Sequence, residues 1–208
     1  ELKCHRAGPA SGIVLEAEIQ QGKGIVAHLL VQDGTLVRGD VILAGEGYGK
    51  VRSMHDDRAK IVDSATPSTP VEVSGLSSLP GVGEAFYVVG DLAQAKEVAE
   101  ERERKNRAMS LTERRAVTAE SMMKSAKEPV QTINLIVRAD VQGSVEVLRS
   151  ALSELKHAEV EVKVLHAGVG AVTESDVLLG TSSNATVIAF HTGVNDKARE
   201  AAEREGVQ

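Results

Sequence analysis

The amino-acid sequence predicts a multi-domain protein: an antiparallel β-barrel and a three-layer α/β domain with a parallel sheet, joined by a helix. Residues 11–90 contain many short apolar runs separated by Gly, Pro and Asp. Residues 92–109 contain neither Gly nor Pro, and residues 132–208 alternate strand-like with helix-like patterns. We therefore expect the barrel at 1–91, a helical linker at 92–109 and the α/β domain at 110–208.

Composition limits the classes of function. The 208 residues carry a net charge of −6, which argues against a whole-surface nucleic-acid binder and leaves room only for local RNA contacts. Aromatic residues make up 2%, too few for binding single strands by base stacking. The single cysteine, Cys4, excludes an internal disulfide and fits a reducing compartment. With no signal-peptide pattern and no long apolar run, a cytoplasmic location is expected.

The barrel strands follow from alternation and turns. Residues 13–20 place apolar side chains at the odd positions, a period of two that is typical of a strand. The turn at 21–24 contains two glycines and leads into a second strand at 25–32. Further strands are expected at 41–44, 48–54, 59–62, 71–73 and 85–89. Many short strands with tight turns favour a closed barrel.

The connecting segment is predicted to be a polar helix exposed to solvent. Opposite charges four residues apart support it, in the pairs Glu100–Arg104, Glu101–Lys105 and Glu103–Arg107. Ser110 followed by Glu113 is typical of a capping box. We therefore expect two helices with a break near Met109, the second ending before Pro129.

The last part alternates strands and helices. Strands are expected at 133–137, 160–164 and 185–190, with a helix at 144–155 between the first two. Thr173 opens a short helix with Asp176 in its first turn, and Asn195 opens the final one. Such alternation predicts parallel strands with right-handed crossovers. Residues 206–208 stop where a fourth strand would begin, so the last strand is expected to be truncated.

Glycine-rich segments do not predict nucleotide binding. Residues 45–51 have the wrong spacing for a phosphate loop, and Val51 lacks the hydroxyl that would hold Mg²⁺. Residues 168–170 lack the third glycine of a dinucleotide loop. We therefore assign Gly143, Gly168 and Gly170 to backbone turns. The histidines show no metal-ligand spacing and nothing suggests a nucleophile–base pair, so no catalytic or metal residue is assigned.

Basic side chains are the remaining candidates. Lys50 and Arg52 share one face of a predicted strand, and Arg58 and Lys60 lie just beyond the following turn. Lys23 occupies the tip of a glycine hairpin. Such a cluster can bind phosphates without reading sequence. On sequence alone, such residues more often belong to a solvated outer face than to a phosphate-binding site.

Five segments carry recognisable motifs, at residues 34–40, 48–54, 68–72, 139–146 and 166–177. The two from the α/β region, ADVQGSVE and HAGVGAVTESDV, are the specific ones, whereas the barrel segments also suit related translational GTPases. Through them the chain resembles the bacterial translation initiation factor 2 family over nearly its whole length. The resemblance is weakest at 108–128.

The resemblance implies that the domains of the protein have different functions. In that family a GTP-binding domain precedes such a barrel and a tRNA-binding barrel follows the α/β domain, so GTP and Mg²⁺ are expected in a missing domain and no cofactor in this chain. The first barrel is similar to the second domain of elongation factors, which implies contact with the small ribosomal subunit and its rRNA. The α/β domain would relay the nucleotide state, helping initiator tRNA binding and subunit joining. The chain itself is expected to be a non-enzymatic monomer without membrane contact.

Two alternatives stay open. The first is a small-molecule module, in which loops near residues 142–143, 168–173 and 192–195 line a crevice for an anion or nucleotide at the strand carboxyl ends. The second is a protein-interaction scaffold without RNA contact.

Overall fold

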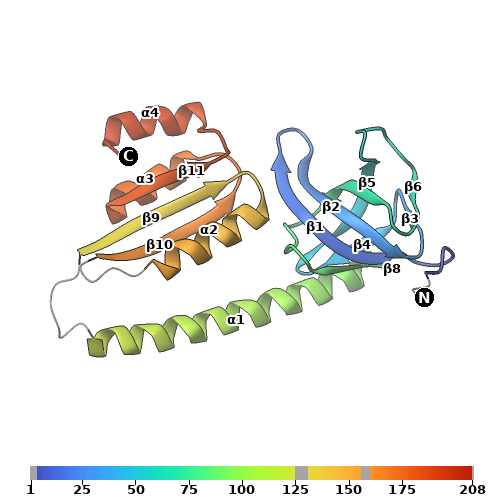
Figure 1. Cartoon of the computed structure of the whole chain (residues 1–208), viewed down its shortest axis with the longest axis horizontal. Helices are drawn as coiled ribbons and strands as arrows, with labels where there is room; N and C mark the ends of the chain where they lie inside the picture. Colours follow the sequence, from blue (N-terminus) through green and yellow to red (C-terminus); the bar gives the residue numbers. More distant parts are fainter. Residues whose placement is uncertain (1–3, 125–130, 156–159, 208) are drawn as a thin grey trace. The chain divides into compact units, whose positions relative to one another are not determined.

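The computed structural model describes residues 4–124, 131–155 and 160–207, and the side chains of these except 110–124. The chain divides into two compact units, residues 1–120 and 121–208, and each is described by itself (Figure 1). The predicted three-part division into barrel, linker and α/β domain stays a prediction. None of the described helices combines the length and the apolar character required to cross a membrane.

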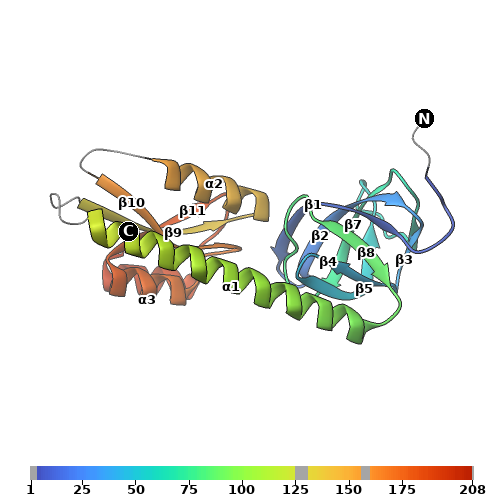
Figure 2. The ribbon, with the colours of Figure 1, turned by 90° about the horizontal axis from the view of Figure 1, so that it is seen from below.

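The first unit contains a closed antiparallel barrel, as predicted. Its strand order is β1-β2-β7-β5-β4-β8, and Figure 2 shows the strands curving around one another. The strands are β1 (Ser11–Gln20), β2 (Gly24–Asp33), β4 (Val41–Ala44), β5 (Gly47–His55), β7 (Pro70–Leu76) and β8 (Ala85–Val89). Two short strands, β3 (Leu36–Val37) and β6 (Ser64–Ala65), pair with each other. The strand expected at 59–62 is wrong, because a turn occupies 57–59 and only Ile61 forms an isolated bridge.

Aliphatic side chains fill the barrel, as the low aromatic content requires. Val14 and Ala17 of β1 point inward with no exposed surface, and Leu29 of β2 and Val73 of β7 do the same. Phe86 is the largest fully buried side chain. Burying such apolar surface is the main stabilising contribution to a barrel of this size.

A single helix, α1 (Leu92–Lys124), follows the barrel, so the predicted break near Met109 is wrong. The segment contains no Gly or Pro, and placing Ser110 inside a run of strong helix formers costs less than ending the helix there. The predicted capping box of Ser110 and Glu113 lies outside the described side chains, and the segment before Pro129 lies outside the described residues. Two predicted ion pairs form, whereas Glu100 lies near Lys96 at 3.7 Å.

The first turns of α1 pack on the barrel rather than standing in solvent. Ala95 and Ala99 are buried against Leu43 of β4. One turn further, Arg102 Nη1 donates to the carbonyl oxygen of Gly45 at 2.9 Å. Residue 106 continues the stripe, its amide donating at 2.7 Å to the carboxylate of residue 46. The prediction of a helix exposed to solvent is therefore wrong for this part of α1.

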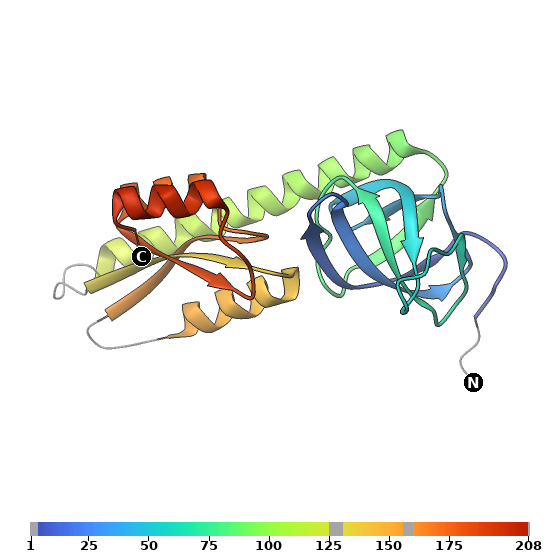
Figure 3. The same ribbon diagram turned by 90° about the horizontal axis from the view of Figure 1, so that it is seen from above.

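The second unit is a three-stranded parallel sheet in the order β10-β9-β11, with helices on both faces. Its elements are β9 (Gln131–Ala139), α2 (Gln142–Glu154), β10 (Val160–Val169), α3 (Glu174–Ser183), β11 (Ala185–Phe190) and α4 (Asp196–Glu205). Helix α2 packs on β10 and β9, whereas α3 contacts β11 and α4. Figure 3 shows α2 and α4 on opposite sides of the sheet. The predicted parallel α/β class is confirmed.

Candidate nucleic-acid interface

Two of the predicted cations share the outer face of β5. Lys50 and Arg52 are exposed, while Gly49 before them and Val51 between them are buried. This follows from strand geometry, because successive side chains point to opposite sides of the sheet. The alternation therefore separates a charged outer row from an apolar inner row.

A glycine in the neighbouring strand shapes this row. The register of β5 with β7 shifts between Gly49 and Ser53, so that Lys50 to Arg52 bulge opposite Gly75. Gly75 has a φ of +112°, and a Cβ there would lie 3.0 Å from Arg52 Cγ and collide with the carbonyl oxygen of Lys50. Only glycine allows β7 to approach the bulge this closely.

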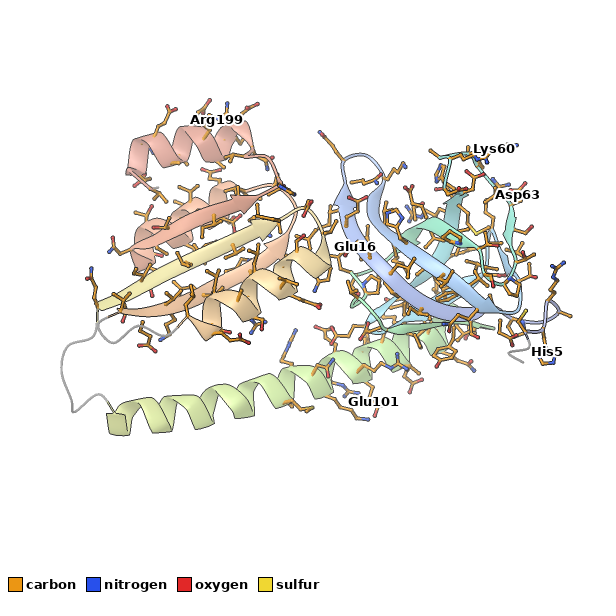
Figure 4. All side chains as sticks on the ribbon, in the orientation of Figure 1. His5, Glu16, Lys60, Asp63, Glu101 and Arg199 are labelled. Atoms are coloured by element: carbon orange, nitrogen blue, oxygen red, sulfur yellow. The ribbon has the colours of Figure 1, made fainter. Side chains whose placement is uncertain are left out.

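The turn after β5 holds the next two cations. Asp56 Oδ1 accepts hydrogen bonds from the backbone N–H groups of Arg58 and Lys60, both at 2.9 Å. The backbone N–H of Asp56 donates to the carbonyl oxygen of Lys60 at 2.9 Å. The N–H of Ala59, whose φ is +58°, donates to the carbonyl oxygen of Asp56 at 3.0 Å. Arg58 and Lys60 are exposed, and Figure 4 shows Lys60 projecting from this connection.

Ionisation of Asp56 is favoured by the same contacts. The hydrogen bond from the Lys60 backbone has the largest effect on the pKa of Asp56 and lowers it. The backbone hydrogen bond from Arg58 and the charges of both cationic side chains also lower it, and together these effects outweigh desolvation, which raises it. The pKa of Asp56 therefore lies below its usual value, and the turn keeps a full carboxylate at neutral pH.

Lys23 is placed differently. Its Nζ donates to Glu72 Oε1 of β7 at 2.8 Å. His55 Nδ1 lies 3.3 Å from the same oxygen, without hydrogen-bond geometry. Lys23 therefore has a fixed counter-ion, separated from it by 49 residues in sequence.

The other four cations have none among the described residues. No ion pair within residues 4–109, 131–155 and 160–207 involves Lys50, Arg52, Arg58 or Lys60, the set called here the β5 basic cluster. Nearby, Arg38 does pair with Asp63 at 3.1 Å. Asp56, on whose charge Arg58 and Lys60 act, and the exposed Asp57 lie next to this set. Exposed cations without a fixed ion-pair partner are able to bind phosphates.

In the second unit the predicted turn and cap residues surround one ion pair. Arg138 of β9 makes two hydrogen bonds to Asp176 of α3, at 3.0 and 2.8 Å. Asp176 is 3% exposed and also accepts from the N–H and hydroxyl of Thr173, the N-cap residue of α3. Burial raises the pKa of Asp176, but the bonds from Arg138 and Thr173 outweigh it and leave the pKa below its usual value.

The glycines have distinct places around this pair. Gly168 is the next-to-last residue of β10 rather than a turn residue, so its assignment to a turn is wrong. It is closely packed, since a Cβ there would lie 2.7 Å from Arg138 Nη1. Gly170 turns the chain with a φ of +99° and donates to the carbonyl oxygen of Ala139 at 2.8 Å. Gly143 lies in the first turn of α2 rather than in a loop. No group of three or more His, Cys, Asp or Glu in the described chain is arranged to hold a metal ion.

Comparisons with known proteins agree across both units. Residues 108–208 match the family Translation-initiation factor 2, and residues 9–89 match Elongation factor G domain 2. The whole chain is 44% identical to translation initiation factor IF-2 of Caldanaerobacter subterraneus subsp. tengcongensis and 47% identical to that of Moorella thermoacetica. It spans 30% and 23% of the lengths of these relatives. Among solved structures, GDP-bound aIF5B from Aeropyrum pernix is 25% identical with a TM-score of 0.50, covering 98% of this chain and 34% of that one.

Proposed function

We propose that this chain, which belongs to the translation initiation factor 2 family, binds the small ribosomal subunit by contacting rRNA phosphates with the β5 basic cluster. The observation that supports this most is four exposed cations without a described ion pair, on a chain of net charge −6. Lysine and arginine side chains on an exposed strand and turn neutralise backbone phosphates without selecting bases. Lys23 is a weaker candidate because Glu72 already neutralises it.

The second part of the proposal is mechanical coupling. Ala95, Ala99 and Arg102 attach the first turns of α1 to the barrel, so a displacement of the barrel carries that part of the helix with it. The helix then continues without a break to Lys124. In this proposal α1 transmits movement between the barrel and the α/β unit and so supports initiator tRNA binding and subunit joining.

The chain is proposed to act by binding alone, as a cytoplasmic monomer. GTP and Mg²⁺ would bind in a domain beyond this chain, since its glycine-rich segments lack the residues that hold a nucleotide. The whole factor, not this chain, would then be the GTPase.

The anion-binding alternative has less support. At the carboxyl ends of the parallel strands, the Arg138 guanidinium is already neutralised by Asp176. Asp140, at the same edge, adds another carboxylate, 3.8 Å from His191. One cavity of about 300 Å³ in this unit is lined by residues such as Gly180 and Ala185, at the opposite, amino end of β11. A second, of about 120 Å³, is lined by Val172, Val194 and other apolar residues, whose side chains offer no group to bind an anion. An incoming anion would meet net negative charge at the carboxyl edge.

Chemical footprinting of small ribosomal subunits with the chain bound tests the rRNA contact. We expect wild-type chain to protect a localised rRNA segment, and the Lys50→Glu/Arg52→Glu variant to lose that protection. The matched control, Lys197→Glu/Arg199→Glu, makes the same charge change on exposed positions of α4 and should keep it. Equal protection by both variants, or none with the wild type, would overturn the proposal and favour the scaffold without RNA contact.

A further inference from the structure

We propose that Asp56, although acidic, is the positioning residue of the phosphate contact: it locks the turn that presents Arg58 and Lys60. This inference rests on the proposed function. The negative charge of Asp56 would by itself predict the opposite, that Asp56 weakens phosphate binding. An aspartate inside a basic cluster repels a phosphate. Its hydrogen bonds, however, fix the backbone from which two of the four cations project.

The bonding pattern makes Asp56 the centre of this turn. One carboxylate oxygen, Oδ1, accepts from two backbone N–H groups, those of Arg58 and Lys60. The main chain of Asp56 bonds to residues 59 and 60, closing the same loop. Ala59 takes a left-handed φ of +58°, which side chains rarely adopt, so the turn is not the relaxed state of a free chain. Removing the Asp56 acceptor leaves a strained conformation with fewer bonds to hold it.

Asp57 provides an internal comparison. It carries the same charge one residue further along, is exposed, and has no hydrogen bond from its side chain among the described contacts. Any effect of negative charge on phosphate binding is common to both residues. Any effect of backbone order belongs to Asp56 alone. The pair therefore separates electrostatics from positioning.

Magnitudes favour positioning. Repulsion between a water-exposed carboxylate and a phosphate at physiological salt is screened and is worth roughly twofold in affinity or less. Ordering a loose turn with two long cationic side chains on binding costs roughly three- to tenfold in affinity. Loss of the Asp56 acceptor should therefore weaken binding even though it removes a repulsive charge.

The experiment measures the affinity of the 208-residue chain for isolated small ribosomal subunits with three variants. Asp56→Ala should weaken binding roughly three- to tenfold. Asp56→Asn keeps an Oδ1 acceptor without the charge and should bind as tightly as the wild type, or up to about twofold tighter. Asp57→Ala should strengthen binding by about twofold or less. In amide exchange, the N–H groups of Arg58 and Lys60 should exchange faster in Asp56→Ala only.

The outcomes separate the two proposals. If Asp56→Ala binds like Asp57→Ala, or more tightly than the wild type, the positioning role is overturned while loss of binding in Lys50→Glu/Arg52→Glu still upholds the rRNA contact. If Lys50→Glu/Arg52→Glu binds like the wild type, the rRNA contact fails, and the role of Asp56 fails with it. Because the turn is exposed, an unchanged unfolding midpoint for Asp56→Ala excludes a global folding defect.

Discussion

The ammonium of Lys23 lies 2.8 Å from the Oε1 atom of Glu72, across the surface of the barrel between the β1–β2 turn and β7. Burial raises the pKa of Glu72, but the hydrogen bond and charge of Lys23, with His55 and His28, outweigh it and leave the pKa below its usual value. The pair is partly exposed, so it contributes modestly to stability. Its functional consequence is that one of five candidate cations is already neutralised.

Lys23 and Lys50 should therefore differ in their effect on ribosome binding. Lys50→Ala removes an uncompensated cation and should reduce the slope of log affinity against log salt by about one. Lys23→Ala leaves Glu72 unpaired nearby and should reduce the slope by less than half as much, since few counter-ions are displaced at a neutralised site. Titrations with small subunits at several salt concentrations measure this. Equal slope changes would show that the ion pair opens on binding.

Gly75 should be required by the bulge of β5. Gly75→Ala places a Cβ against the carbonyl oxygen of Lys50 and the stem of Arg52. Gly83→Ala is the control, because its φ is +79° but nothing lies within 4 Å of the added Cβ. Backbone strain alone should lower the free energy of unfolding of Gly83→Ala by about 1 kcal/mol. We expect Gly75→Ala to lower it by roughly 2–4 kcal/mol. Urea unfolding measures both, and equal costs would contradict the packing role.

Helix docking on the barrel should depend on small side chains. Ala99→Glu forces a carboxylate against Leu43, where no partner is described, and should destabilise the docked turns by roughly 2–4 kcal/mol. Ala93→Glu is the control on an exposed position of the same helix. Amide exchange over residues 95–106 should rise in the first variant only. Unchanged exchange in Ala99→Glu would mean that the helix does not need the barrel.

Acid should weaken the second unit through Asp176. Its pKa is lower in the folded state than the unfolded value of about 3.9, so its contribution is fully present above that pH and is lost as pH falls through the folded value. Arg138→Ala should destabilise the unit by about 3 kcal/mol at neutral pH, because it leaves a buried carboxylate without its cation. The variant should also lose less stability below pH about 4. Unfolding curves at neutral and acid pH measure both, with Arg199→Ala as the neutral control.

Local patterns in the sequence predicted the classes of both units. The alternation in β1 and the glycines of its turn were enough to indicate a barrel strand, and the spacing of Thr173 and Asp176 indicated the start of α3. The docked stripe of α1 was missed because it is built from Ala95, Ala99 and Arg102, which have little apolar surface to set against the charges around them. The sequence did contain one signal for it, since steps of four and then three residues place these side chains on one face of a helix.

Contacts between distant residues could not be predicted. Nothing in the sequence links Lys23 to Glu72, because the pairing depends on barrel strand order. The role of Asp56 did have a local signal, since aspartate often accepts backbone hydrogen bonds two residues on in a turn. Ala59, however, is not a residue that sequence favours for a left-handed conformation, and this led to the wrong strand at 59–62.

The most direct test of the rRNA contact is the salt dependence of small-subunit binding for the wild-type chain and a variant in which Lys50, Arg52, Arg58 and Lys60 are all replaced by Gln. Affinities measured between about 50 and 200 mM salt give the number of phosphates contacted. We predict that the slope of the wild type exceeds that of the variant by about three to four. Identical slopes would show that the β5 basic cluster faces solvent and that rRNA phosphates are not its partners.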